Sequence, residues 1–260
     1  MTKGDTKIGI VAGAGPYAGL DLAQKILQQT SAKIDQDYLP TISISTPADI
    51  ADRTRFLLGQ TTKNPAHAIF RNLTELEDLG ATVAGIPCNT AHASAIQDVF
   101  MEELKQSGSR LKVLDMIAET VDFLRKTCPE VKIVGVLSTI GTWKAGFYPK
   151  LLGEAGYEVR ILEEPQQQRL HDEALYHPDY GIKVQAHPVS KAARKVLLEG
   201  VHELEKQDVQ AVVLGCTEIP LGIPERKLGS TYLIDPGLIL ARALIREFCT
   251  EKLLPWSWKT

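Results

Sequence analysis

Two cysteines, Cys88 and Cys216, each come directly after an apolar run that is rich in β-forming residues. A thiol moves a proton or attacks carbon only as a thiolate, so its ordinary pKa of about 8.5 must be lowered or its proton taken locally. Backbone N–H groups at the turn after each strand would favour an anion there. A single cysteine of this kind is usually a small packed residue. Two in matched contexts predict a pair of acid/base groups.

Polar residues next to the two cysteines could bind a carboxylate. Asn89 and Thr90 follow Cys88, Thr217 follows Cys216, and Thr139 ends another apolar run in the second half of the chain. Glu218 could orient or deprotonate Cys216. A glutamate at the start of a helix is also simply a favourable charge, and both interpretations stay open.

The elements that must position these residues alternate between short apolar runs and longer helical patterns, which is typical of βαβ units with a parallel sheet. We expect helices over residues 18–32 and 183–207, one opening at Asn64-Pro65, and a closing helix from Pro236. The expected strands cover residues 8–11, 41–45, 82–86, 113–114, 132–137, 158–162, 211–214 and 232–234.

A faint internal repeat organises the chain. Ile8 and Ile133 each open a βαβ run that reaches a cysteine after a nearly equal distance. The sequence therefore predicts an α/β fold of two pseudo-symmetric parallel-sheet domains facing each other across a cleft. Residues 1–109 with 229–260 form the expected first domain, which carries Cys88, and residues 110–228 form the second, which carries Cys216. The crevice of an open α/β sheet lies beyond the carboxyl ends of its strands, where both thiols would lie.

Composition excludes several classes of partner. The formal net charge is −3 and no dense Lys/Arg tract occurs, so we expect no nucleic-acid partner. The first apolar run is too short for a signal peptide or a membrane span, which predicts a cytoplasmic protein without a membrane partner. The 4 Cys show no CxxC pairing, so we expect reduced thiols. We also expect a homodimer.

Five segments together resemble the aspartate racemases of the aspartate/glutamate/hydantoin racemase superfamily. The resemblance runs from about Ile8 to Ala241, and the Asp-Arg-Thr segment narrows it to the aspartate branch. The segments are Gly13-Ala14-Gly15-Pro16, Ala51-Asp52-Arg53-Thr54, Pro87-Cys88-Asn89-Thr90-Ala91-His92, Ser138-Thr139-Ile140-Gly141-Thr142 and Leu214-Gly215-Cys216-Thr217-Glu218-Ile219-Pro220.

The resemblance implies two α/β domains, with the last helix packing back onto the first. It also implies interconversion of L- and D-aspartate without pyridoxal phosphate, metal or any other cofactor, Cys216 working on the L face and Cys88 on the D face. Glutamate or maleate is the alternative substrate within the superfamily. Arg53 would bind the distal carboxylate of this small acidic substrate, and the α-carboxylate would be held by Asn89, Thr90, Thr139 and Thr217.

The chain departs from its relatives at three positions. Glutamate racemases carry an acidic residue where this chain has Ala12, and a histidine where it has Glu218. Some aspartate racemases place a lysine near the position of His171, as a second cation for the distal carboxylate. A histidine is a conditional cation there, so substrate affinity would fall as pH rises through its pKa. His171 is otherwise an ordinary helix-surface histidine.

Three competing interpretations lie outside this superfamily. Gly13 and Gly15 follow the first strand as in an NAD(P)-linked oxidoreductase, but the strand over residues 41–45 ends without the acidic residue that binds ribose. A zinc site from Cys88, His92 and Cys216 would lack further residues with ligand spacing. An amino-acid receptor would be exported, and we find no export signal. In the racemase interpretation, Gly13 and Gly15 shape the turn that supports the site.

Overall fold

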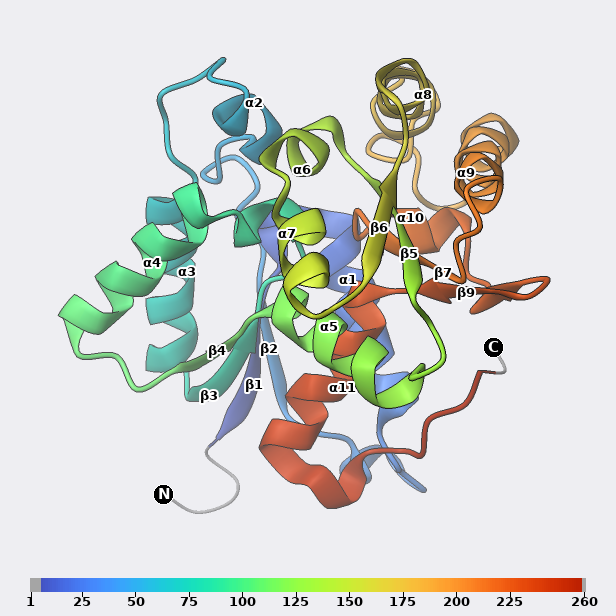
Figure 1. Ribbon diagram of the computed structural model, residues 1–260. Helices are drawn as coiled ribbons and strands as arrows, with labels where there is room; N and C mark the ends of the chain where they lie inside the picture. The colour runs from blue at the N-terminus through green and yellow to red at the C-terminus, as the bar shows by residue number, and fades with distance from the viewer. Residues whose placement is uncertain (1–5, 259–260) are drawn as a thin grey trace. The chain divides into compact units, whose positions relative to one another are not determined.

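The chain divides into two compact units in the computed structural model, which describes residues 6–258. The first unit comprises Met1–Glu119 with Gly237–Trp256, and the second comprises Thr120–Pro236 with Ser257–Thr260. Each unit is built on one mainly parallel sheet with helices on both faces (Figure 1). The expected α/β class with two parallel sheets is therefore confirmed.

The first sheet is parallel throughout and has the strand order β2-β1-β3-β4. Its two central strands are apolar and almost fully buried, as parallel strands covered on both faces must be. The bounds of the strands are β1 (Lys7–Val11), β2 (Thr41–Ile44), β3 (Ala81–Gly85) and β4 (Lys112–Leu114).

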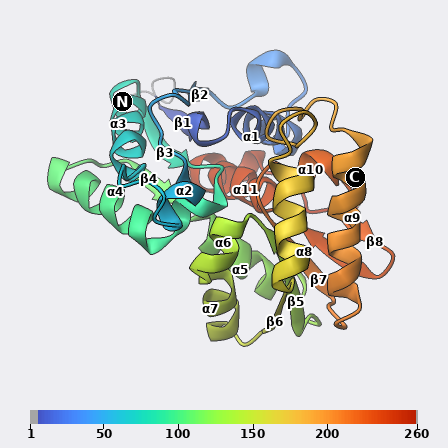
Figure 2. The ribbon, with the colours of Figure 1, turned by 90° about the horizontal axis from the view of Figure 1, so that it is seen from above.

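Helices cover both faces of this sheet. Ile69 of α3 and Phe100 of α4 are fully buried in one core cluster, so these two helices share a face. On the other face a Cβ at Gly85 would meet Leu240 and Leu244 of α11 at 3.0 Å, so the final helix packs closely on β3. Figure 2 shows α3 and α4 on one side of the strands, and α1 and α11 on the other. The helices of the first unit are α1 (Pro16–Gln29), α2 (Arg53–Leu57), α3 (Ala66–Asp78), α4 (Ser94–Ser107), α11 (Pro236–Cys249) and the 3₁₀ turns η1 (Ala12–Ala14), η2 (Asp35–Asp37), η3 (Asn89–His92) and η5 (Thr250–Lys252).

The second sheet has the order β6-β5-β7-β9-β8, in which only the short edge strand β8 is antiparallel. Leu197 and Val201 of α9 pack on one face, in a cluster with Leu137 and Leu214 from the central strands. The strands of this sheet are β5 (Ile133–Ser138), β6 (Glu158–Ile161), β7 (Ala211–Gly215), β8 (Lys227–Leu228) and β9 (Thr231–Ile234). The remaining helices are α5 (Met116–Thr127), α6 (Ile140–Ala145), α7 (Phe147–Glu154), α8 (Glu164–Arg169), the π-helical turn η4 (Leu170–Leu175), α9 (Lys191–Glu205) and α10 (Ile219–Gly222).

The two sheets repeat one strand order. Taking β5 as the counterpart of β1, the series β2-β1-β3-β4 matches β6-β5-β7-β9 position by position. Cys88 follows β3 and Cys216 follows β7, so both cysteines come after the same strand of the repeat. The helix after β4 lies mostly in the second unit, from Thr120 onward, and the helix after β9 lies in the first, from Gly237 onward.

Two strands belong to the other sheet from the one in which we placed them. We grouped residues 113–114 with the second half, but β4 pairs with β3 in the first sheet. We placed residues 229–260 with the first domain, but β9 pairs with β7 in the second sheet. A polar, glycine-containing stretch indicates where the chain turns, and it carries no information about which strand the next one pairs with.

The expected long helix over residues 183–207 was wrong at its start. Helix α9 begins at Lys191, after Ser190, whose hydroxyl accepts a hydrogen bond from the Ala193 N–H. Pro188 has no N–H to donate within a helix and disfavours helical geometry in the residue before it, which explains why the segment ahead of Ser190 is not a continuous helix. The predicted start near Asn64 was close: α3 begins at Ala66, whose N–H bonds to the Asn64 side chain at 2.9 Å.

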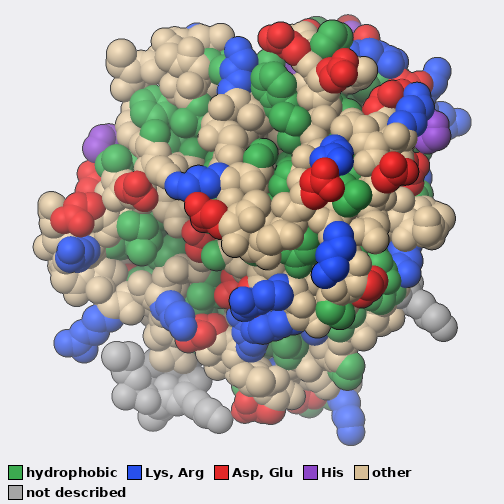
Figure 3. Space-filling model, in the orientation of Figure 1, with side chains coloured by type: hydrophobic (Ala, Val, Ile, Leu, Met, Phe, Trp, Pro, Cys, Tyr) green, Lys and Arg blue, Asp and Glu red, His purple; other side chains and the backbone are tan. Residues whose placement is uncertain are grey.

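On the face shown in Figure 3, acidic and basic side chains are interspersed and no large area carries one sign. This distribution accords with the small formal net charge of −3. No helix within residues 6–258 is long and apolar enough to cross a bilayer.

Candidate functional site

Cys88 lies in a tight turn at the carboxyl end of β3. Its N–H bonds to the Ile86 carbonyl at 2.8 Å, closing a three-residue turn with Pro87 at the centre. Proline fixes its own φ, which suits the central position of such a turn. Cys88 then caps η3, and Asn89 and Thr90 are buried in this 3₁₀ turn. The turn therefore gathers three of the residues that the sequence singled out.

Each cysteine is followed by only about one turn of helix. After Cys88, η3 is a single 3₁₀ turn and α4 begins only at Ser94. After Cys216, helix α10 covers only Ile219–Gly222. A full helix dipole is thus not available at either thiol, because the dipole grows from many aligned peptide units. Individual backbone N–H groups remain as the local donors.

Arg53 lies in the first unit at the start of α2, which contacts η3. Asp52 caps this helix by accepting a hydrogen bond from the Arg55 N–H at 2.8 Å. The Arg53 guanidinium donates to the Ala14 carbonyl, and to the Ala51 carbonyl at 3.4 Å. The structure thus brings Arg53 to the turn after β1, next to the elements that carry Cys88.

Gly13 and Gly15 form this turn between β1 and α1. A Cβ at Gly13 would lie 2.7 Å from the backbone nitrogen of Thr46, so the residues after β2 can approach only because Gly13 has no side chain. Gly15 caps α1, ahead of Pro16. Strand β2 ends at Ile44, and Ser45 and Thr46 follow, without the acidic side chain that a dinucleotide fold places there.

In the second unit, Cys216 contacts a buried carboxylate. The Cys216 Sγ donates to Glu218 Oε2 at 3.1 Å, and both residues are nearly inaccessible, at 4% and 3% exposure. The other oxygen of Glu218 pairs with the Lys183 ammonium. Glu218 therefore does more than cap a short helix: its carboxylate connects the thiol to a cation.

Burial raises the pKa of the Cys216 thiol to about 12, because the thiolate would lose its hydration. The positive charge of Lys183 opposes this rise, while the negative charge of Glu218 adds to it. The thiol is thus held in its protonated form at neutral pH. A group in this state can donate a proton, and it can ionise only by passing its proton to a nearby base.

The register of the second sheet places Thr139 beside Cys216. Ser138 of β5 pairs with Gly215 of β7, so Thr139 and Cys216 come directly after this pair. The Thr139 hydroxyl caps α6 by accepting from the Thr142 N–H at 3.3 Å. Thr217 is buried and donates its hydroxyl to Glu218 Oε2 at 3.4 Å. Thr139, Cys216 and Thr217 therefore follow the carboxyl ends of two adjacent strands.

His171 lies in the π-helical turn η4, which packs against α9. Its ring packs against that of Tyr176, with centroids 4.3 Å apart and the planes tilted by 34°. Gln168 donates to Asp172 and Arg169 pairs with Glu173, so these two acidic neighbours are engaged by other side chains. His171 is half-buried in the same unit as Cys216.

Sequence reasoning missed Lys183. We assigned it to the start of a helix, whereas it follows the turn at Gly181 and reaches Glu218. Its neighbours, Ile182 and Val184, form no motif that a search for chemistry would detect. Its partner lies in another element, so only the tertiary structure could pair the two charges.

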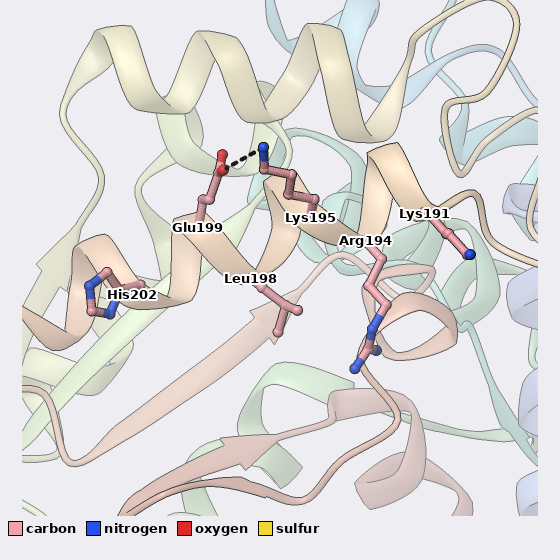
Figure 4. Close-up of a pocket in the computed structure, with 6 residues that line it drawn as sticks. All are labelled: Lys191, Arg194, Lys195, Leu198, Glu199 and His202. Carbon is pink, nitrogen blue, oxygen red and sulfur yellow. Dashed lines mark ion pairs between the residues drawn. The ribbon is translucent and has the colours of Figure 1, made fainter.

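One shallow hollow, of about 440 Å³, lies on the outer side of α9 and includes none of the candidate residues. Figure 4 shows that its lining comes from a single helix, with Lys195 paired to Glu199. Arg194 pairs with Glu225 at 2.6 Å. Lys195 and Arg194 are thus already paired with carboxylates, so neither favours binding of a substrate carboxylate in the hollow. Within residues 6–258, no three His, Cys, Asp or Glu side chains gather as a metal site would require.

Comparison with known proteins identifies the family. The sequence profile of the Asp/Glu/Hydantoin racemase family matches residues 11–244. A glutamate racemase of Pediococcus pentosaceus is 30% identical over 172 residues, 65% of this chain and 58% of that protein. The chain thus matches less than two thirds of that relative. A broad specificity amino-acid racemase of Bacillus subtilis is 25% identical over 249 residues, 93% of this chain and 97% of that protein.

Among solved structures, the aspartate racemase of Picrophilus torridus superposes with a TM-score of 0.75 at 29% identity, covering 93% of this chain and 94% of that one. The aspartate racemase homologue of Pyrococcus horikoshii superposes with a TM-score of 0.67 at 23% identity, and it supports the fold alone. The profile match over residues 11–244 shows that the chain belongs to the Asp/Glu/Hydantoin racemase family.

Proposed function

We propose that the protein interconverts L- and D-aspartate without a cofactor, using Cys88 and Cys216 as its two acid/base groups. One observation carries the proposal: the two sheets repeat one strand order, and each cysteine follows the equivalent strand. A packed structural cysteine has no reason to recur at this position in both halves. A racemase does, because it must remove a proton from one face of a carbon and return one to the other.

The proton balance assigns opposite states to the two thiols. One thiolate takes the α-proton, forming S–H as C–H breaks, and the other thiol gives its proton to the carbanion. In our proposal Cys216 exchanges the proton of the L enantiomer and Cys88 that of the D enantiomer. The raised pKa of Cys216 suits it as the proton donor in the conversion of D- to L-aspartate.

The reverse direction needs a thiolate at Cys216. Glu218 is the base within reach, at 3.1 Å from the sulfur. When Glu218 takes the thiol proton, the thiolate formed at Cys216 lies close to the positive charge of Lys183, which lowers its energy. We therefore assign Glu218 as the local base for Cys216, and Lys183 as the cation that compensates the negative charge.

For substrate recognition, we propose that Arg53 binds the distal carboxylate and that His171 assists it. A guanidinium offers a carboxylate two parallel hydrogen bonds. The α-carboxylate would be held by Asn89, Thr90, Thr139 and Thr217. The likeness to the Picrophilus torridus aspartate racemase extends over 93% of this chain, which favours aspartate. Glutamate is the second candidate, because a glutamate racemase is 30% identical over 65% of the chain.

The first experiment tests the activity directly. Purified protein is incubated with L-aspartate, L-glutamate or maleate without added cofactor, and the products are resolved by chiral chromatography. We expect D-aspartate to form fastest. Faster formation of D-glutamate would transfer the proposal to glutamate, while no product from any of the three substrates would refute it.

The second experiment tests the two thiols separately, in D₂O. Cys88→Ala should lose racemisation but still exchange the α-proton of L-aspartate, and Cys216→Ala should exchange only D-aspartate. Because one acid/base group contributes about 10²- to 10⁴-fold in rate, long incubations and NMR of each enantiomer are needed. Cys249→Ala is the matched control and should racemise normally. If either active-site variant racemises near the wild-type rate, the thiol it lacks is not a catalytic base.

A further inference from the structure

A buried histidine next to Cys88 has a set of contacts that the reaction as proposed does not use. The side chain of His92 is 1% exposed. Its Nε2 lies 3.3 Å from the Ile86 carbonyl oxygen, and its Nδ1 lies 3.2 Å from Gln97 Oε1. Burying an imidazole is costly unless both nitrogens have partners. Here each ring nitrogen has one.

The Ile86 carbonyl connects this histidine to the thiol. The same oxygen accepts the Cys88 N–H at 2.8 Å, the bond that closes the turn around Pro87. A carbonyl oxygen has two lone pairs, so it can accept from the Cys88 backbone and from His92 together. The second donor fixes the direction of the carbonyl and, with it, the turn that aims the Cys88 side chain.

The other side of the ring is held by two further elements. Gln97, on α4, donates from Nε2 to Asp115 Oδ2 at 2.8 Å. This bond sets the amide orientation and directs Oε1 to His92. Asp115 lies 3.7 Å from the ring and also accepts from the Ile117 and Ala118 N–H groups at the start of α5. Burial opposes its ionisation, but the charge of His92 and these hydrogen bonds outweigh it, so the pKa of Asp115 is lowered.

Among the described contacts, Cys216 has a different support. It follows Gly215 of β7 directly, without an intervening proline turn, and its own side chain contacts Glu218. The network around His92 therefore supports the half of the repeat that carries Cys88. In the described contacts, the Cys88 thiol has no acidic partner.

We propose that His92 is a positioning residue for Cys88: by donating from Nε2 to the Ile86 carbonyl, it fixes the Pro87 turn that aims the thiol. Gln97 and Asp115 hold the opposite nitrogen and prevent the ring from rotating. The proposal rests on the proposed function, since it assigns His92 to the Cys88 half of the reaction. A histidine that only filled space would be replaced by leucine without loss.

Two substitutions separate the hydrogen bond from the packing. His92→Leu fills the buried space without a donor, while in His92→Gln the side-chain amide nitrogen replaces Nε2. Each is made in the Cys216→Ala background, where only the exchange at Cys88 remains, and in the Cys88→Ala background, where only the exchange at Cys216 remains. The measurement is deuterium incorporation into D- and L-aspartate respectively.

We expect His92→Leu to slow exchange into D-aspartate by about 10²-fold and His92→Gln to restore most of it, while exchange into L-aspartate changes little. Equal losses in both backgrounds, or equal losses for Leu and Gln, would overturn the proposal. If His92→Leu does not fold, Gln97→Leu removes the Nδ1 partner instead and should give a smaller loss confined to D-aspartate. An unchanged rate in Gln97→Leu would then count against it.

A second measurement needs no activity. Both substitutions are made in the otherwise unaltered protein, and amide hydrogen exchange is followed by mass spectrometry. In the peptide containing Cys88, exchange should be faster for His92→Leu and close to wild type for His92→Gln. In the peptide containing Cys216, exchange should be unchanged. If the wild-type protein does not racemise any substrate, the proposed function fails while this measurement still decides whether His92 fixes the turn. Unaltered exchange in the Cys88 peptide of His92→Leu refutes the positioning role on its own.

Discussion

Replacing Glu218 with glutamine tests the arrangement around Cys216 most sharply, because it should change thiol reactivity and turnover in opposite directions. The pKa of Cys216 is about 12, well above that of a free thiol. At 1.36 kcal/mol per unit, this difference is on the order of 4 kcal/mol against the thiolate. Burial is its largest cause, and the Glu218 charge contributes to it.

Glu218→Gln keeps the shape but removes that charge, while the positive charge of Lys183, which lowers the pKa of Cys216, remains. Two charges about 4 Å apart at an effective dielectric constant of 20 interact by about 4 kcal/mol, so the pKa of Cys216 should fall by roughly one to three units. Iodoacetamide should therefore alkylate Cys216 about tenfold faster or more at pH 7.5. Lys183→Met should act in the opposite direction and slow the alkylation.

Turnover should fall in Glu218→Gln, because an amide cannot accept the thiol proton. A loss of about 10²- to 10⁴-fold in deuterium exchange into L-aspartate is expected for removal of a general base. The assay combines peptide mass spectrometry for alkylation with NMR for exchange. Glu225→Gln, which breaks the ion pair with Arg194, is the matched control and should change neither. Racemisation at the wild-type rate in Glu218→Gln would show that Glu218 is not the base, and slower alkylation would refute the electrostatic reasoning.

Three other predictions concern recognition, stability and cofactor. Arg53→Ala should weaken aspartate turnover (kcat/KM) by roughly 2–5 kcal/mol, with Arg53→Lys intermediate, and near-normal kinetics would make Arg53 a structural cation. Burial also raises the pKa of Cys128 to about 12, so its contribution to the free energy of unfolding is intact below pH 9 and is lost between pH 9 and 12. Between pH 9 and 12, the free energy of unfolding should therefore fall less steeply with pH in Cys128→Ala than in Cys249→Ala. The two slopes should differ by up to about 1.4 kcal/mol per pH unit. Racemisation should survive EDTA and hydroxylamine but not iodoacetamide, and loss with EDTA would indicate a metal.

The sequence by itself determined most of the strands and the equivalent positions of the two cysteines. Apolar runs of strand length alternating with helical patterns identified all but one short edge strand, because burial on both faces of a parallel sheet demands such runs. The repeat placed Cys88 and Cys216 at equivalent strand ends, since the residue that follows a strand can be read from the chain itself. The start of α9 was missed although Pro188 and the capping residue Ser190 mark it in the sequence.

Only the tertiary structure decided which strands pair and which charges meet. β4 pairs with β3, and β9 pairs with β7. These pairings depend on packing across the sheet, and the residues around each strand do not indicate its partner. Glu218 pairs with Lys183, and His92 reaches Gln97, through contacts between different elements. Residue type and spacing report which side chains lie on one element. The neighbours that hold and tune them come from other elements, and folding alone brings these together.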